Sequence, residues 1–179
     1  DTKEALNGDQ RLAKAKFKAE IFINQLKDLN NAQRVDSIKQ ANDTDNLKDL
    51  SQIVSTASDL NNSMSELKAK LKETVNPVKS SINYINADYD LKRQFNKAIK
   101  DAREALSKTK GANLNERDIQ GLSQAIDSTK DALNGEQRLA EAKEKSKQFI
   151  KQLDTLNNAQ NNYLTNEINK SYLLCLLYL

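Results

Sequence analysis

The chain has 179 residues and a formal net charge of +3, with no His, no Trp, one Cys and one Pro. Helix-forming Ala, Leu, Lys, Glu and Gln are abundant, whereas aromatic residues make up only 5% of the chain. This composition predicts an all-α protein with thin cores of Leu, Ile and Ala, and it excludes sites that need histidine, such as histidine-ligated zinc or nucleophile–histidine pairs.

A segment of 32 residues occurs twice. Residues 2–33 recur without a gap at 129–160, a constant offset of 127 positions, and 22 of the 32 positions are identical. A repeat of this length and fidelity is typical of a tandem array, in which similar modules provide reach, spacing or multivalency. We therefore expect a structural or adhesive protein and no enzyme, and we expect neighbouring repeats of the chain to contact one another.

Apolar residues at helical spacing define a first three-helix bundle. Helices are predicted over residues 9–30, 33–42 and 46–60. The buried face of the first helix is expected to be a stripe that advances in steps of three and four residues. Its members are Leu12, Ala15, Ala19, Phe22, Leu26 and Leu29.

The third of these helices is predicted to continue into a second bundle. Its apolar stripe shifts by one residue between Ser58 and Asn62, while helix-forming residues continue to Asn76. We interpret the shift as one long helix, about 46–76, that leaves one core and enters the next. The helix is expected to stop at Pro77, because the proline ring disfavours helix in the residue before it.

Two further helices are predicted to complete the second bundle. One spans 88–110, with Asp88 as its candidate N-cap and Gly111 as its stop. The other spans 115–134 and begins at Asn115, a second capping residue. The predicted domains are therefore two three-helix bundles, which we place by these helices at 1–60 and 61–134.

The second copy of the duplicated segment contains Asn134-Gly135, where the apolar stripe changes face again. Asn-Gly often forms a turn, so the dipeptide either separates two helices or lies inside one long helix that serves two cores. We favour the continuous helix, because helix-forming residues resume at once. Residues 135–160 are then the first helix of a further, incomplete bundle, and long helices shared between bundles predict an elongated rod.

Residues 161–179 do not continue the repeat and end in the apolar run Tyr172 to Leu179, which contains Cys175. The run is too short for a membrane helix, which needs about 20 residues. We interpret 161–179 as a non-native tail, left by an expression vector or by read-through. A diverged native repeat and a membrane anchor are the alternatives.

No catalytic, cofactor-binding or metal-binding residue is identified in the sequence. Walker and Rossmann glycine patterns are missing. Asp88 and Asp90 invite comparison with a calcium loop, but no further acidic ligand follows at loop spacing, so helix capping is the expected role. Lys and acidic residues alternate along the helices, which argues against the concentrated basic patch that nucleic-acid binding requires.

Aromatic residues are the remaining candidates for a binding surface. Phe22, Phe95 and Phe149 fall on core stripes and are expected to be buried. Tyr84 and Tyr89 lie in or beside a connecting segment, where a surface role is more open. The residues that bind a partner stay unknown.

Several motifs together resemble a known family. They are Tyr89-Asp90 before a helix, the run Ala132-Leu133-Asn134-Gly135, and the run Leu156-Asn157-Asn158-Ala159-Gln160. Over about residues 1–160 the chain resembles the FIVAR and GA-like repeats of the giant staphylococcal extracellular-matrix-binding surface proteins.

The resemblance implies a rod-like module of a very long, cell-wall-attached adhesin outside the bacterial cell. It implies weak, multivalent binding of a host matrix protein such as fibronectin, with no cofactor, small-molecule substrate or nucleic acid. The alternative is a mechanical spacer or cell-envelope scaffold with no host ligand in this segment. Some GA modules bind serum albumin through their second helix, but residues 30–47 lack the exposed tyrosine-bearing segment of those modules, so albumin binding is not expected.

Overall fold

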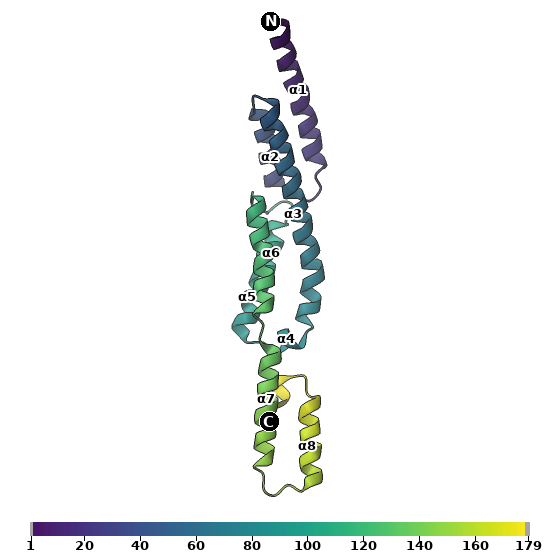
Figure 1. Ribbon diagram of the computed structural model, residues 1–179, viewed down its shortest axis with the longest axis vertical. Helices are drawn as coiled ribbons and strands as arrows, with labels where there is room; N and C mark the ends of the chain where they lie inside the picture. Colours follow the sequence, from purple (N-terminus) through teal and green to yellow (C-terminus); the bar gives the residue numbers. More distant parts are fainter. Residues whose placement is uncertain (1, 178–179) are drawn as a thin grey trace. The chain divides into compact units, whose positions relative to one another are not determined.

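The computed structural model describes residues 2–177, without the side chains of residues 2–6 and 176, and the described part contains helices and no strand (Figure 1). The predicted all-α class is confirmed. The elements are α1 (Thr2–Gln25), α2 (Asn31–Asp43), α3 (Leu47–Lys79), α4 (Ile82–Ile85), α5 (Tyr89–Ala105), α6 (Glu116–Asp131), α7 (Gly135–Lys151), α8 (Asn158–Lys170) and the 3-10 helix η1 (Leu174–Leu177).

The chain forms two compact units. Unit 1 comprises residues 1–72 and 98–125, and unit 2 comprises 73–97 and 126–179. Helices α3, α5 and α6 each contribute residues to both units. The predicted rod concerns how the units are placed, and it stays a prediction.

Unit 1 packs α1 against α2, and Gln33 of α2 contacts Met64 of α3. Its core is made of Leu, Ile, Ala and one Met, as the composition predicts. The buried apolar residues are Ala19, Ile23, Leu29, Ala41, Leu50, Ala57, Leu60, Met64, Leu67, Leu71, Ala98, Ile99, Ala102, Ala105 and Ile119.

The predicted core stripe of α1 is wrong at Phe22. Ile23 is fully buried, whereas Phe22 is 40% exposed. The second copy repeats the pattern, because Ile150 is buried and Phe149 is 62% exposed. In both copies the branched residue one position later takes the inward-facing place, while Ala19 and Leu29 of the predicted stripe are buried as expected.

The long third helix is confirmed, but its predicted end is wrong. Helix α3 runs without interruption through the stripe shift at 58–62 and ends at Lys79, beyond Pro77. Proline removes only one N–H donor from this last turn. The hydroxyls of Ser80 and Ser81 donate to the carbonyls of Asn76 (3.0 Å) and Val78 (2.7 Å), which satisfies acceptors at the helix end.

Helix α5 is shorter than predicted. It ends at Ala105, so Thr109 lies outside the helix, in the turns that lead to α6. The physical reason is tertiary, because the carbonyl of Ala105 accepts a hydrogen bond from Asn30. The predicted cap of the next helix is correct, since Asn115 Oδ1 accepts from Asp118 N at 3.0 Å.

Unit 2 contains the short helix α4, which the sequence did not predict. Tyr84 of α4 packs edge-on against the fully buried Phe95, with ring centroids 5.9 Å apart. Asn96 Nδ2 donates to the Tyr84 hydroxyl at 2.8 Å. Helix α4 also packs against α7, so it determines where α7 begins.

The favoured continuous helix through Asn134-Gly135 is wrong. Helix α6 ends at Asp131 and α7 begins at Gly135. Glu136 N donates to Asn83 Oδ1 at 3.1 Å, which caps α7 from the neighbouring helix. A Cβ at Gly135 would lie 2.1 Å from the backbone oxygen of Asn83, so only glycine allows this approach.

Charged groups reinforce the same junction. Asn134 Nδ2 donates to Asp88 Oδ2 at 2.7 Å, and Asn134 Oδ1 accepts from Asp88 N at 3.1 Å. Arg138 donates to the Asn86 carbonyl at 2.7 Å and pairs with Asp88 Oδ1 at 3.1 Å. Asn-Gly alone does not break the helix, because Asn7-Gly8 lies inside α1, so we attribute the break to the contacts around α4.

Residues 161–170, which the sequence analysis places in the tail, continue helix α8, which begins at Asn158. Helix α8 (158–170) has the bounds of α2 (31–43) shifted by 127 positions, although few positions after 160 are identical at that offset. The reason is that Asn157 and Gln160 form the same capping box as Asn30 and Gln33. No helix in residues 2–177 combines the length and apolar character that crossing a membrane requires.

Candidate interaction site

The turn between α1 and α2 carries a reciprocal capping box. Asn30 Oδ1 accepts a hydrogen bond from Gln33 N at 2.9 Å, and Gln33 Oε1 accepts from Asn30 N at 3.0 Å. Both side chains are fully buried. Because the cap engages the two amide oxygens, the two NH₂ groups remain to donate elsewhere.

These two NH₂ groups hold the segment 105–114, which connects α5 to α6. Their acceptors in this segment are all backbone carbonyls. The contact therefore depends on the backbone conformation of the segment and not on the identity of the side chains that carry those carbonyls. A buried amide left without such an acceptor would cost about 1–3 kcal/mol. We call these bonds the amide contact: Asn30 Nδ2 to Ala105 O (3.2 Å) and Ala112 O (2.9 Å), and Gln33 Nε2 to Leu114 O (2.9 Å).

Lys108 extends the contact toward α1. Its carbonyl accepts from Asn31 N at 2.9 Å, and its amine donates to the carbonyls of Leu29 (3.0 Å) and Lys27. The last carbonyls of a helix and its following turn lack partners within the helix. Lys108 supplies two of the missing donors, so α1, α2 and segment 105–114 are tied together at one point.

A second cation serves the same helix end. The guanidinium of Arg34 donates to the carbonyls of Asn24 and Leu26, each at 2.7 Å. Positive charge is favourable there because it opposes the helix dipole. Burial lowers the pKa of Lys108, the charge of Asp28 opposes that change, and the charges of Arg34 and then Lys68 lower the pKa further.

Gly111 allows segment 105–114 to approach so closely. A Cβ at this position would lie 2.5 Å from Ala105 O and 2.5 Å from Asn30 Nδ2. Any side chain would therefore displace the amide contact. Gly111 was expected to stop a helix, but its role is to let two backbone segments meet.

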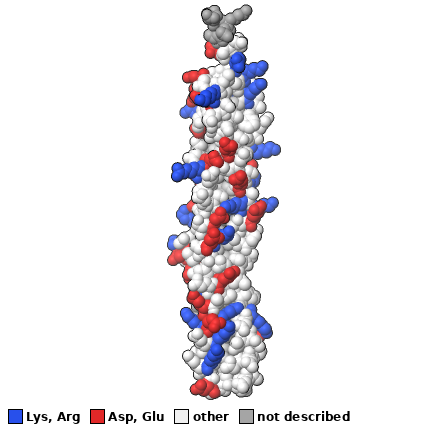
Figure 2. All heavy atoms as spheres, in the orientation of Figure 1, with Lys and Arg blue, Asp and Glu red and all other residues white. Residues whose placement is uncertain are grey.

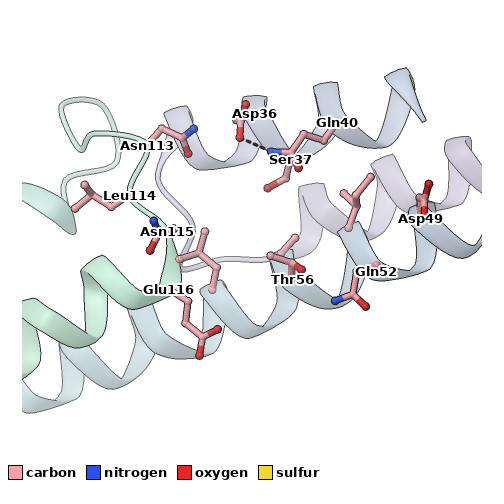
Figure 3. Close-up of a pocket in the computed structure, with 13 residues that line it drawn as sticks. Asp36, Ser37, Gln40, Asp49, Gln52, Thr56, Asn113, Leu114, Asn115 and Glu116 are labelled. Atoms are coloured by element: carbon pink, nitrogen blue, oxygen red, sulfur yellow. Dashed lines mark hydrogen bonds between the residues drawn. The ribbon is translucent and has the colours of Figure 1, made fainter. Parts of the chain in front are cut away.

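A groove of about 600 Å³ opens beside the amide contact in unit 1 (Figure 3). Helices α2 and α3 form its walls, and residues 113–116 lie at one end. The lining mixes carboxylates, amides and hydroxyls with a few apolar groups. The residues are Asp36, Ser37, Gln40, Asp49, Gln52, Ile53, Thr56, Ala57, Leu60, Asn113, Leu114, Asn115 and Glu116.

The groove offers hydrogen-bond acceptors over a small apolar floor. All three of its carboxylates already have local partners. Asp36 accepts from Gln40 Nε2 and Asp49 accepts from Asn46 Nδ2, each at 2.6 Å, and Glu116 accepts from Gln120 Nε2 at 2.9 Å. In the described part of the chain no three Asp, Glu, Cys or His side chains are grouped as metal ligands would be.

Charge is dispersed over the face of the molecule in view. Lys and Arg side chains alternate there with Asp and Glu, without a large region of one sign (Figure 2). Several of the ion pairs join exposed residues three or four positions apart in one helix, such as Arg93 with Asp90 at 3.1 Å. Exposed pairs of this kind contribute little to stability.

The candidate site residues named in the sequence analysis do not come together in one site. Asp88 lies at the start of α5 as expected, but its carboxylate contacts Asn134 and Arg138, and Asp90 pairs with Arg93. Tyr84 packs in unit 2 and Tyr89 is 78% exposed. None of them lines the groove of unit 1.

The amide contact was missed in the sequence. One signal could have indicated it: Leu29 to Gln33 recurs unchanged as Leu156 to Gln160, while the residues just before and after diverge. A capping box alone explains Asn and Gln at these positions. The burial of both amides depends on segment 105–114, which is remote in sequence.

Family comparisons cover most of the chain. The GA module matches residues 9–63 and 136–175, and the FIVAR domain matches residues 63–134. Curated relatives include the extracellular matrix-binding protein EbhA of Staphylococcus aureus (strain Newman) and the extracellular matrix-binding protein ebh of S. aureus (strain NCTC 8325 / PS 47), each 37% identical over 171 residues. The alignments cover 96% of this chain but only 5% and 2% of those two proteins.

Two solved structures are similar. The crystal structure of the EbhA 756-1003 domain from S. aureus matches with a TM-score of 0.89 and 28% identity, over 97% of this chain and 72% of that one. A structure from the characterization of extracellular matrix binding protein (Embp)-mediated Staphylococcus epidermidis adherence to fibronectin matches with a TM-score of 0.62 and 26% identity. That match covers 70% of this chain and 98% of the other.

Proposed function

Because this chain belongs to the family of proteins built from GA modules and FIVAR domains, we propose that it is a repeat module of a bacterial surface adhesin. Its ligand in this proposal is a host matrix protein, with fibronectin as the first candidate. Each module binds weakly, and many copies raise the apparent affinity through effective concentration. The observation that carries the proposal is the similarity to matrix-binding relatives over 96% of the chain.

The proposed module boundaries follow the family matches. A GA-like bundle at 1–60 and a FIVAR-like bundle at 61–134 are supported by matches at 9–63 and 63–134. A second GA-like bundle begins at 135. Its match extends to residue 175, which includes helix α8.

The proposed location is outside the cell, attached to the cell wall as part of a longer protein. The relatives are named as extracellular matrix-binding proteins, which supports an extracellular site. We propose no catalytic role, in keeping with relatives named for binding.

The groove between α2 and α3 is the proposed contact surface. It is recessed, mixed in polarity and lined mostly by exposed or partly exposed residues, so it could accept a polypeptide without rearrangement of the core. Ordinary interfaces also combine an apolar centre with a polar rim. A groove of this size would provide the low affinity per module that an array needs.

A pair of arginine substitutions tests the groove. Thr56→Arg places a long cation inside it, whereas Ser55→Arg puts the same charge on an exposed neighbouring position that does not line it. We expect Thr56→Arg to reduce saturable fibronectin binding in a surface assay and Ser55→Arg to leave it unchanged. Equal loss in both variants would indicate a charge effect, and binding unaffected by Thr56→Arg would exclude the groove.

The second candidate is a mechanical spacer or envelope scaffold without a host ligand. Helix α3, 33 residues long, favours it, because it links residues of both units in one continuous element. Absence of saturable fibronectin binding by the unaltered chain would support the spacer over the adhesin.

A further inference from the structure

The dipeptide Asn-Gly occurs at the same place in both copies of the duplicated segment, as Asn7-Gly8 and as Asn134-Gly135. Asparagine before glycine loses its side-chain amide more readily than before other residues, because glycine has no side chain to hinder attack by its own backbone nitrogen. Ala-Leu precedes the dipeptide in both copies, and an acidic residue followed by Gln and Arg comes after it. The intrinsic reactivity of the two asparagines is therefore matched, and a difference between them reports on the fold.

Loss of this amide needs only water as a second reactant. The backbone nitrogen of Gly135 would bond to Cγ of Asn134 and close a cyclic imide, and Nδ2 would leave as ammonia with the former Gly135 proton. Water then opens the imide. The product at position 134 is aspartate, or isoaspartate when the backbone continues through the former side-chain carbonyl.

The contact of α4 and Asp88 with the start of α7, which we call the α4 junction, opposes this attack. At Asn134 ψ is 16°, which turns the nitrogen of Gly135 toward the nitrogen of Asn134 and away from Cβ and Cγ. Asp88 holds the side chain, since Asn134 Nδ2 donates to Asp88 Oδ2 at 2.7 Å and Asn134 Oδ1 accepts from Asp88 N at 3.1 Å. Closing the imide ring therefore requires both hydrogen bonds to break and the backbone to rotate beside Asn83, which Gly135 closely approaches.

The α4 junction does not fit either product. Aspartate at position 134 would put a carboxylate oxygen where Nδ2 now lies, 2.7 Å from Asp88 Oδ2, and two like charges this close repel one another. Arg138 pairs with the other oxygen of Asp88, Oδ1, at 3.1 Å. Isoaspartate would add a carbon atom to the backbone where even a Cβ on Gly135 would lie 2.1 Å from Asn83 O. Loss of the amide therefore opposes renewed closure of the junction.

We propose that Asn134 is a deamidation site that the α4 junction protects, so that loss of its amide marks junctions that have opened. While Asp88 and the Asn83 backbone hold the turn, Asn134 keeps its amide. Local opening of the junction frees the side chain and the backbone, and Asn134 then reacts as it does in an unfolded chain. The modified residue afterwards opposes closure. This inference goes beyond matrix binding and does not depend on the adhesin proposal.

The chain supplies its own reference for the measurement. Trypsin releases the two dipeptides in peptides 4–11 and 131–138, which have the same amino-acid composition and are separated by chromatography. Mass spectrometry follows the deamidated fraction at Asn7 and at Asn134 while the full chain is incubated in mildly alkaline buffer. In urea, which unfolds the chain, both asparagines should react at the same rate. In the folded chain Asn134 should react at least about tenfold more slowly than in urea, because two hydrogen bonds must break first.

Substitutions identify the protecting group. Asp88→Ala removes the acceptor of Asn134 Nδ2, so it should raise the rate at Asn134 in the folded chain about fivefold and leave the rate at Asn7 unchanged. Asp90→Ala is the matched control, because Asp90 is exposed and pairs with Arg93 in the same helix. Asn134→Asp imitates the product, and it should accelerate hydrogen exchange at residues 132–134 at least about fivefold.

The proposal is overturned if Asn134 reacts as fast in the folded chain as in urea. It is also overturned if Asp88→Ala, shown by circular dichroism to be folded, leaves the rate at Asn134 unchanged. Should Asp88→Ala not fold, the comparison with urea and the exchange of Asn134→Asp still decide the question. Unchanged exchange at 132–134 in Asn134→Asp would contradict the claim that the product opposes closure.

Discussion

Gly8 and Gly135 occupy the same position of the duplicated segment, yet their surroundings differ. A Cβ at Gly8 would meet no heavy atom within 4 Å, while a Cβ at Gly135 would lie 2.1 Å from Asn83 O. Neither glycine has a positive φ. The requirement for glycine at 135 therefore comes from a close approach of two backbones and not from backbone conformation.

Alanine at each of these glycines tests that explanation. Gly135→Ala forces the Asn83 backbone to move, which should lower the free energy of unfolding by about 1–3 kcal/mol. Gly8→Ala lies in open space within α1 and should be neutral or stabilise by up to about 1 kcal/mol. Urea denaturation of both variants measures the difference, and an equal response at the two sites would refute the close-approach account.

Gly111→Ala examines the amide contact in the same way. The added methyl group would lie 2.5 Å from Asn30 Nδ2 and from Ala105 O, so unit 1 should lose about 1–3 kcal/mol. Gly121→Ala is the matched control, since it adds a methyl group in open space on α6. If urea denaturation shows both variants to be equally stable, segment 105–114 is not held as described.

The break between α6 and α7 shows how a tertiary contact overrides local sequence. Residues Asn7-Gly8 lie inside the continuous helix α1, whereas their counterparts Asn134-Gly135 mark the start of a helix. The sequence around both is nearly identical. The difference arises from α4, whose residues cap and contact the beginning of α7.

Arg138 and Arg11 occupy equivalent positions in the two copies of the duplicated segment. Substitutions at these positions therefore test whether contacts near α4 hold the break between α6 and α7. Arg138→Gln removes the bonds to Asn86 O and Asp88, and it should destabilise unit 2 by about 1 kcal/mol because the pair is partly exposed. Amide exchange at residues 132–134 should accelerate. Arg11→Gln, at the exposed counterpart, should change neither quantity. Identical exchange at 132–134 in Arg138→Gln would show that α4 docking does not hold the break.

The elements that could be predicted are helices whose apolar residues recur at clear helical spacing and whose residues have high helix propensity. Helix α3 was predicted as one long element because its apolar stripe shifts without any helix-breaking residue before Pro77. Helix α4 and the end of α5 at Ala105 could not be predicted, since both depend on partners remote in sequence. The amide contact was missed for the same reason. Asn30 and Gln33 are buried by segment 105–114, and the carbonyls that accept from Asn30 lie 75 and 82 residues later in the sequence.

At the scale of the whole molecule, each of the two compact units contains one copy of the duplicated segment. Its first copy is buried by segment 105–114 at Asn30 and Gln33, and its second copy exposes the same pair. An array built this way can repeat one shallow surface many times along one chain. The proposed adhesin uses that repetition, because avidity grows with the number of surfaces that engage together.

The most direct test of the adhesin account compares fibronectin binding by the chain with binding by a chain lengthened by one 127-residue repeat. Immobilised fibronectin and surface plasmon resonance would give the apparent affinity of each. The account predicts weak, saturable binding by the shorter chain and binding at least about 100-fold tighter by the longer one. Equal apparent affinity at both lengths, or no saturable binding by either, would contradict it.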